Sequence, residues 1–125
     1  MLTSVTGKVV KRSGRGKQLG FPTVNLEVPT TFTLAFGSYA GYVQVQNQRY
    51  LAAIYYGTTS WPSSKPQLEA HLLDFSGDLF NQAVTVECVQ FIRPHKKIKH
   101  LKELIDCIKQ DIKQVRTCLP VLLKP

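Results

Sequence analysis

The segment Ser13–Gly20 has the composition of a loop that could hold phosphate groups. It reads Ser-Gly-Arg-Gly-Lys-Gln-Leu-Gly, with three glycines and two cationic side chains. Glycine allows backbone N–H groups to approach a ligand closely, and fixed positive charge attracts an anion. The spacing matches neither the Walker A loop nor the dinucleotide-binding fingerprint. Taken alone, the segment is explained at least as well by an ordinary surface turn.

A possible metal site follows directly, at Thr23 and Asn25. Pro22 biases the residue before it toward extended backbone, and residues i and i+2 of an extended chain point to the same side. A hydroxyl and an amide oxygen are hard ligands, suited to a Mg²⁺ ion that keeps several waters and bridges phosphates. The alternative is a polar strand face in water.

A possible general base lies in the next candidate strand, Gln67–Phe75. Leu68, Ala70 and Leu72 would share one face of this strand, and Glu69 and His71 the other. A carboxylate beside a bound hydroxyl can accept its proton. An ordinary exposed acid would give the same local pattern.

Basic residues also gather where the strand-rich part of the chain ends. Arg93 and Lys96 flank Pro94 and could face an anionic product. A solvated basic loop is the alternative.

The first two thirds of the chain predict strands and turns. Tyr39–Gln46 and Arg49–Tyr56 are expected to form a hairpin that turns at Asn47-Gln48. Ala83–Arg93 is the longest β-branched run, with Val84, Val86 and Cys88 on one face. Many short strands separated by turns indicate a closed antiparallel barrel or a sandwich.

A helix over about residues 99–118 is predicted after the strands, ended by Pro120. Apolar residues recur at the spacing of one helical face, and we expect this stripe to pack on the strands. The stripe consists of Leu101, Leu104, Ile105, Ile108, Ile112 and Val115. Residues 119–125 are expected to form a short tail.

Composition narrows the class of protein. The chain has 125 residues, enough for one domain with its own core, and we expect a single domain over residues 1–125. The three cysteines show no metal-binding spacing and indicate free thiols in a reducing cytoplasm. We expect neither a signal peptide nor a membrane span.

The net charge of +8 is compatible with three kinds of partner: nucleic acid, membrane surfaces and phosphorylated small molecules. The basic clusters lack the aromatics typical of nucleic-acid binding.

The order of these segments resembles the ATP-dependent riboflavin kinase family, from Gly7 to about Arg116. The most specific stretch is Arg15–Asn25, which is similar to the family's R-G-x-x-L-G-F-P-T-A-N signature. Leu68–Phe80 is similar to E-x-H-L-L-D-F-x-G-D-L-Y, and Gly37–Ala40 to G-V-Y-A. The resemblance implies an all-β dominated fold, a six-stranded antiparallel Greek-key barrel over about residues 5–93 with one C-terminal amphipathic helix.

The resemblance also implies roles. The chain would transfer the γ-phosphate of MgATP to the 5′-hydroxyl of riboflavin, giving FMN, with Glu69 as catalytic base and Thr23 and Asn25 holding Mg²⁺. Apart from the resemblance, we expect a monomer that acts in the cytoplasm on small molecules, without nucleic-acid or membrane partners. The residues implied at the nucleotide are Gly14, Arg15, Gly16, Lys17, Gly20, Thr23, Leu72, Asp74 and Phe80. Those implied at the flavin are Arg93, Lys96 and Ile98.

Several positions depart from the family pattern. Tyr55–Thr59 replaces N-I-G-x-x-P-T-F, His95 replaces a common acid, and Ile98 replaces a frequent Phe. Two alternatives to a kinase stay open at this point: a flavin- or nucleotide-binding barrel without turnover, and a nucleic-acid-binding barrel suggested by the charge alone.

Overall fold

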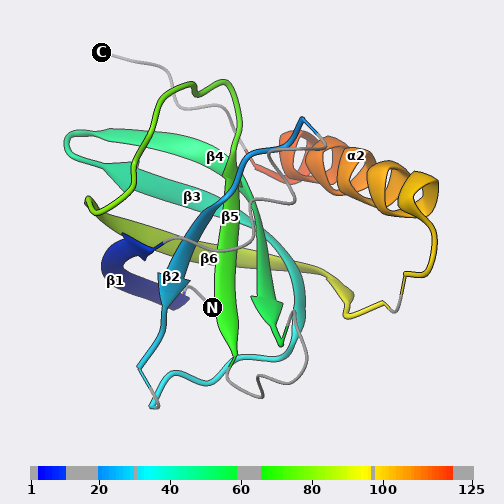
Figure 1. Ribbon diagram of the computed structural model, residues 1–125, viewed down its shortest axis with the longest axis horizontal. Coiled ribbons are helices and arrows are strands. Elements are labelled where there is room, and N and C mark those ends of the chain that lie inside the picture. The colour runs from blue at the N-terminus through cyan, green and yellow to red at the C-terminus, as the bar shows by residue number, and fades with distance from the viewer. Residues whose placement is uncertain (1–2, 11–19, 30, 59–65, 97, 120–125) are drawn as a thin grey trace.

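The computed structural model describes residues 3–10, 20–29, 31–58, 66–96 and 98–119, which form six strands and one helix (Figure 1). The elements are β1 (Thr3–Val10), β2 (Val24–Glu27), β3 (Gly37–Val45), β4 (Gln48–Gly57), β5 (Gln67–Leu72), β6 (Ala83–Pro94) and α2 (Leu101–Cys118).

The six strands form a closed barrel in the order β1-β2-β5-β4-β3-β6, and every neighbouring pair is antiparallel. β3, β4 and β5 follow one another as a meander, and β6 returns to lie beside β3. This is the Greek-key arrangement. β6 then pairs with β1 along its other edge and closes the barrel. The expected six-stranded Greek-key barrel is confirmed, with strand residues from Thr3 to Pro94.

The hairpin between β3 and β4 is confirmed, but its turn lies one residue earlier than predicted. Val45 pairs with Gln48, so Gln46 and Asn47 form the two-residue turn. Gln46 has a φ of 54°, a left-handed conformation that asparagine adopts more readily than glutamine. The predicted turn at Asn47-Gln48 was therefore wrong by one residue.

The barrel interior is filled by alternate residues of each strand. Leu68, Ala70 and Leu72 of β5 are buried inside, and so are Val84, Val86 and Cys88 of β6. Both faces had been predicted from the alternation. Glu69 and His71 consequently lie on the outer surface of the barrel.

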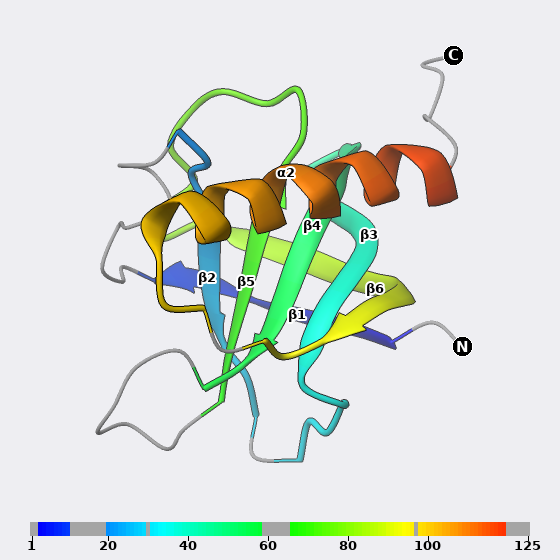
Figure 2. The same ribbon diagram turned by 90° about the vertical axis from the view of Figure 1, so that its right-hand side faces the viewer.

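Helix α2 lies against the outside of the barrel, across β3, β4 and β6 (Figures 1 and 2). Its C-terminal half makes the apolar contact, in a cluster made of Ala40, Tyr42, Leu51, Leu73, Val115 and Leu119. The prediction that the whole stripe packs was wrong at Leu101, which is 53% exposed. It was also wrong to begin a tail at Leu119, which is buried in this cluster. Residues 120–125 lie outside the described part. Among the described residues there is no helix with the length and apolar character needed to cross a membrane.

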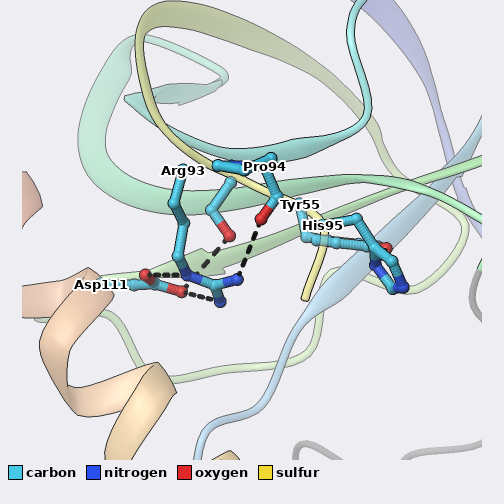
Figure 3. Close-up of polar contacts among 6 residues, drawn as sticks. Tyr55, Arg93, Pro94, His95 and Asp111 are labelled. Carbon is cyan, nitrogen blue, oxygen red and sulfur yellow. Dashed lines mark hydrogen bonds and ion pairs between the residues drawn. The ribbon is translucent and has the colours of Figure 1, made fainter. Parts of the chain in front are cut away.

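A bidentate ion pair fixes the middle of α2 to the barrel. Arg93 Nε donates to Asp111 Oδ1 and Arg93 Nη2 to Asp111 Oδ2, both at 2.8 Å (Figure 3). Ser38 Oγ donates to the same carboxylate at 3.4 Å, and Asp111 is only 8% exposed. The pair therefore joins α2 to β6 and β3 where water has little access.

We expect Asp111→Ala to destabilise the protein by roughly 2–4 kcal/mol, because it leaves the Arg93 guanidinium partly buried without its partner. Urea unfolding followed by circular dichroism measures this. The matched control is Arg116→Gln, which breaks another bidentate pair, Arg116 with Asp74, on the exposed surface. That variant should lose less than about 1 kcal/mol. Equal losses in the two variants would show that burial does not strengthen the Arg93–Asp111 pair.

The three thiols should differ in reactivity. Cys88 lies inside the barrel, and burial raises the pKa of its thiol to about 12, whereas Cys107 and Cys118 are partly exposed. Since the thiolate is the reactive form, we expect Cys88 to resist alkylation at pH 8 until the protein unfolds. Mass spectrometry after iodoacetamide treatment, with and without urea, tests this. Labelling of Cys88 in the folded protein as fast as of Cys107 would contradict it.

Candidate active site

One outward-facing residue from each of five strands falls into a continuous row around the barrel, which we call the polar row. Its members, in order across β2, β5, β4, β3 and β6, are Asn25, Glu69, Tyr55, Ser38 and Arg93. Each is the direct cross-strand partner of the next. Directly opposed residues in an antiparallel pair have Cβ atoms about 4.5–5.5 Å apart. The register therefore brings together side chains that are far apart in the sequence.

Thr23 and Asn25 lie at one end of the polar row. The Asn25 amide donates from Nδ2 to Thr23 Oγ1 at 3.4 Å, so the two side chains share a face as predicted. Asn25 is 7% exposed, and its Oδ1 has no hydrogen-bond partner among the described residues. A buried polar atom without a partner is rare in a folded protein and indicates a ligand or ion. A hard cation fits this oxygen and the neighbouring hydroxyl.

Glu69 occupies the next place in the row, with Asn25 on one side and Tyr55 on the other. It is half-buried. The pKa of the Tyr55 phenol is raised, chiefly by burial and further by the negative charge of Glu69, while Arg93 opposes the shift. The carboxylate is therefore close enough to act on its neighbours electrostatically. The structure brings Thr23, Asn25 and Glu69 together, and their chemical roles stay predictions.

The end of the glycine-rich segment is held against β5. His71 Nδ1 is 2.7 Å from the Pro22 carbonyl oxygen, and the His71 ring meets the Phe21 ring edge-on. Gly20 has a φ of 89°, which favours glycine, and open space surrounds the position of a Cβ. The other candidates in this segment, Gly14, Arg15, Gly16 and Lys17, lie outside the described residues.

The three remaining nucleotide candidates lie at or after the end of β5 and differ in accessibility. Leu72 points into the barrel core, so only its backbone could meet a ligand. Asp74 is exposed and accepts hydrogen bonds from Arg116, whose guanidinium holds the pKa of that carboxyl below its usual value. The Phe80 ring is 45% exposed, in a turn where Asn81 N donates to Val9 O. Phe80 therefore lies close to the end of β1, where the chain enters the glycine-rich segment.

The candidate flavin residues lie at the other end of the polar row. The Arg93 guanidinium is engaged by Asp111, so its clearest role is structural. Lys96 makes a 3.7 Å ion pair with Glu103 and lines an open groove of about 750 Å³ beside the first turns of α2. Ile98 is half-buried in the connection between β6 and α2. Of the expected site residues within the described part of the chain, only Lys96 lines this groove.

Two residues of the site region were not found from the sequence. Tyr55 was noted only as a departure from a family pattern, and its place beside Glu69 follows from the strand register. Asp111 had a readable signal, because it lies three residues after Ile108 and one before Ile112, on the face of the apolar stripe. A carboxylate at a packed helix position indicates a buried cationic partner.

Comparison with known proteins identifies the family. The sequence model of Flavokinase, described as riboflavin kinase, matches residues 2–119. The chain belongs to the riboflavin kinase family.

Among the described residues there is no cluster of three or more His, Cys, Asp or Glu side chains that could hold a metal.

Two relatives and one solved structure are similar to this chain over most of its length. The trifunctional protein RibF/MnmA of Mycoplasmoides gallisepticum is 35% identical over 86% of this chain, which corresponds to 17% of that protein. Human riboflavin kinase is 29% identical over 88% of this chain and 76% of its own length. A solved structure from Streptococcus pneumoniae, described as a macrolide-efflux protein, superposes with a TM-score of 0.81 at 30% identity, over 90% of this chain and 38% of that one. The chain thus spans only a small part of the first of these relatives.

The unpartnered oxygen of Asn25 has a measurable consequence. We expect Asn25→Leu to leave the ligand-free protein as stable as the wild type or more stable by about 1 kcal/mol, because it removes a buried polar group that makes no hydrogen bond through Oδ1. Thermal unfolding without nucleotide or divalent cation measures this. A clear loss of stability would show that Oδ1 is satisfied in the ligand-free protein.

Proposed function

We propose that this riboflavin kinase family member transfers the γ-phosphate of ATP to the 5′-hydroxyl of riboflavin, giving FMN and ADP. The observation that carries the proposal is the cross-strand placement of Glu69 directly opposite Asn25, with Thr23 hydrogen-bonded to Asn25. A carboxylate base next to a pair of hard oxygen atoms is what phosphoryl transfer to an alcohol needs from a protein.

The reaction follows from this placement. Glu69 accepts the proton of the ribityl 5′-hydroxyl while the hydroxyl oxygen forms a bond to the γ-phosphorus. The bond between that phosphorus and the oxygen bridging to the β-phosphate breaks, and ADP leaves with the electron pair. Glu69 then releases its proton to solvent. Because such a transition state is loose, the protein contributes mainly positioning and charge stabilisation.

Asn25 Oδ1 and Thr23 Oγ1 are the atoms we propose for holding the Mg²⁺ that accompanies ATP. When bound there, this ion would neutralise charge on the phosphate oxygens. The unpartnered, buried state of Oδ1 supports this assignment. We place the phosphates beside Gly20. This residue ends the glycine-rich segment, and His71 holds Pro22, two residues later, against β5.

The remaining assignments concern the two substrates and the setting. We propose that the β5–β6 connection, with Asp74 and Phe80, binds the nucleotide, and that Lys96 and Ile98 contact the flavin.

The free thiols support action in a reducing cytoplasm. Among the described residues the strands close into a ring and leave little open strand edge for pairing with a second copy, which supports a monomer acting on small molecules. The streptococcal match supports the fold and no transport function, because it covers only 38% of that chain.

The test is FMN production from riboflavin, ATP and Mg²⁺, measured by chromatography in the wild type and in Glu69→Gln. We expect the variant to lose about 10²- to 10⁴-fold in kcat, because the amide cannot accept the proton, while substrate binding survives. Wild-type protein that binds FMN but makes none from riboflavin would favour a binding barrel over a kinase.

Glu87→Gln is the matched control. Glu87 is also a half-buried glutamate on the outside of the barrel, but it is paired with Arg49 and lies outside the site. Its kcat should stay within about 2-fold of the wild type. If Glu69→Gln keeps full activity, Glu69 is not the base.

A further inference from the structure

Tyr55 and His95 are joined by a short hydrogen bond, although they are far apart in the sequence. Tyr55 Oη and His95 Nδ1 are 2.6 Å apart, and the two ring centroids are 5.9 Å apart. Tyr55 comes from β4, and His95 from the connection between β6 and α2 (Figure 3). This bond ties the connection that carries Lys96 and Ile98 to the strand next to Glu69.

The position of Tyr55 in the polar row places it beside any acceptor that reacts at Glu69. A hydroxyl that gives its proton to Glu69 must come within about 2.6–3.2 Å of the carboxylate. The Tyr55 Cβ lies about 4.5–5.5 Å from that of Glu69, because the two residues are direct cross-strand partners. Burial raises the pKa of Tyr55, and the negative charge of Glu69 raises it further. The Tyr55 side chain thus begins beside Glu69, and its ring lies along β4 over Gly57, where its Oη is 2.6 Å from the position of a Cβ.

The hydrogen bond to His95 fixes the direction of the phenol. A free tyrosine ring on a barrel surface can rotate about two side-chain bonds, and ordering it on ligand binding would weaken binding. The hydrogen bond to His95 restricts this rotation, because it holds the Tyr55 hydroxyl toward the connection between β6 and α2. Among the described residues, Glu69 and Arg93 are the charged groups that shift the pKa of Tyr55, after the larger effect of burial, and Arg93 is held in place by Asp111. The ring is therefore fixed before the acceptor arrives.

We propose that Tyr55 is a specificity-determining contact for the acceptor substrate and that His95 is the positioning residue that holds it. The Tyr55 ring forms a wall for the polyol chain of a riboflavin-like acceptor next to Glu69. Both residues occupy positions where the chain departs from the family pattern, and the structure shows that these two departures meet in a single hydrogen bond. The inference rests on the proposed function for the identity of the acceptor.

Steady-state kinetics and binding test the pair in Tyr55→Phe, in His95→Gln and in the double variant. We expect each single change to raise the KM for riboflavin about 5-fold, the effect of one hydrogen bond, with kcat and the KM for ATP within about 2-fold of the wild type. The double variant should also show about 5-fold, not the 25-fold of independent effects, because both changes remove the same bond. Riboflavin affinity, measured by quenching of flavin fluorescence, should change in parallel.

Tyr56→Phe is the matched control. Tyr56 is the next residue of the same strand, but it points into the barrel, where its hydroxyl is 3.4 Å from the Phe32 carbonyl oxygen. Its KM for riboflavin should not change. An unchanged KM and affinity for riboflavin in Tyr55→Phe, a 25-fold effect in the double variant, or an equal rise in the KM for ATP would each overturn the inference. Failure of the wild type to make FMN would instead contradict the proposed function, and the binding measurement would still decide the role of the pair.

Discussion

The strand register of the closed barrel is the constraint on which the rest of the structure depends. Because side chains alternate between the two faces of a strand, a shift of one residue in any ladder would send its member of the polar row into the core. The packed interior makes such a shift costly, since residues such as Leu26, Leu68 and Val86 are fully buried. Apolar packing inside the barrel thus fixes polar geometry outside it. The barrel needs no separate device to align Glu69 with Asn25.

The helix contributes to the site in a different way. Its C-terminal half is held by apolar contacts, and its middle by the Arg93–Asp111 pair. The pair also fixes Arg93 at the end of the polar row, two residues before His95. The same ion pair therefore stabilises the docking of α2 and limits the movement of the connection that carries the candidate flavin residues. Residues that stabilise the fold and residues proposed to bind the flavin alternate along the connection between β6 and α2. The sequence alone therefore does not show which of these two roles a charged residue there has.

Local alternation predicted the inward faces of β5 and β6 and the shared face of Thr23 and Asn25. It left a barrel or a sandwich open, and the resemblance to a family implied the six-stranded barrel. The resemblance placed Glu69 near Thr23 and Asn25, but the other neighbour of Glu69, Tyr55, was not predicted, since cross-strand register depends on how all six strands close. The same limit explains Tyr55 and His95, which look like unrelated departures until the barrel brings them together. The exposure of Leu101 was missed for another reason: periodicity shows which side of a helix is apolar, but not how far along its length a partner surface extends.

The closure of the barrel has a consequence for the order in which the protein can assemble. Thr3 pairs with Cys88, so the ladder between β1 and β6 joins segments from the two ends of the barrel sequence. Contacts between residues so distant along the chain are entropically expensive to form and are associated with slow folding. The meander of β3, β4 and β5 is local by comparison and can form early. Asn25 and Arg93, at opposite ends of the row, lie on β2 and β6, the two strands that pair with β1 on either side. A chain emerging from the ribosome therefore has no complete site until most of the barrel sequence has been made.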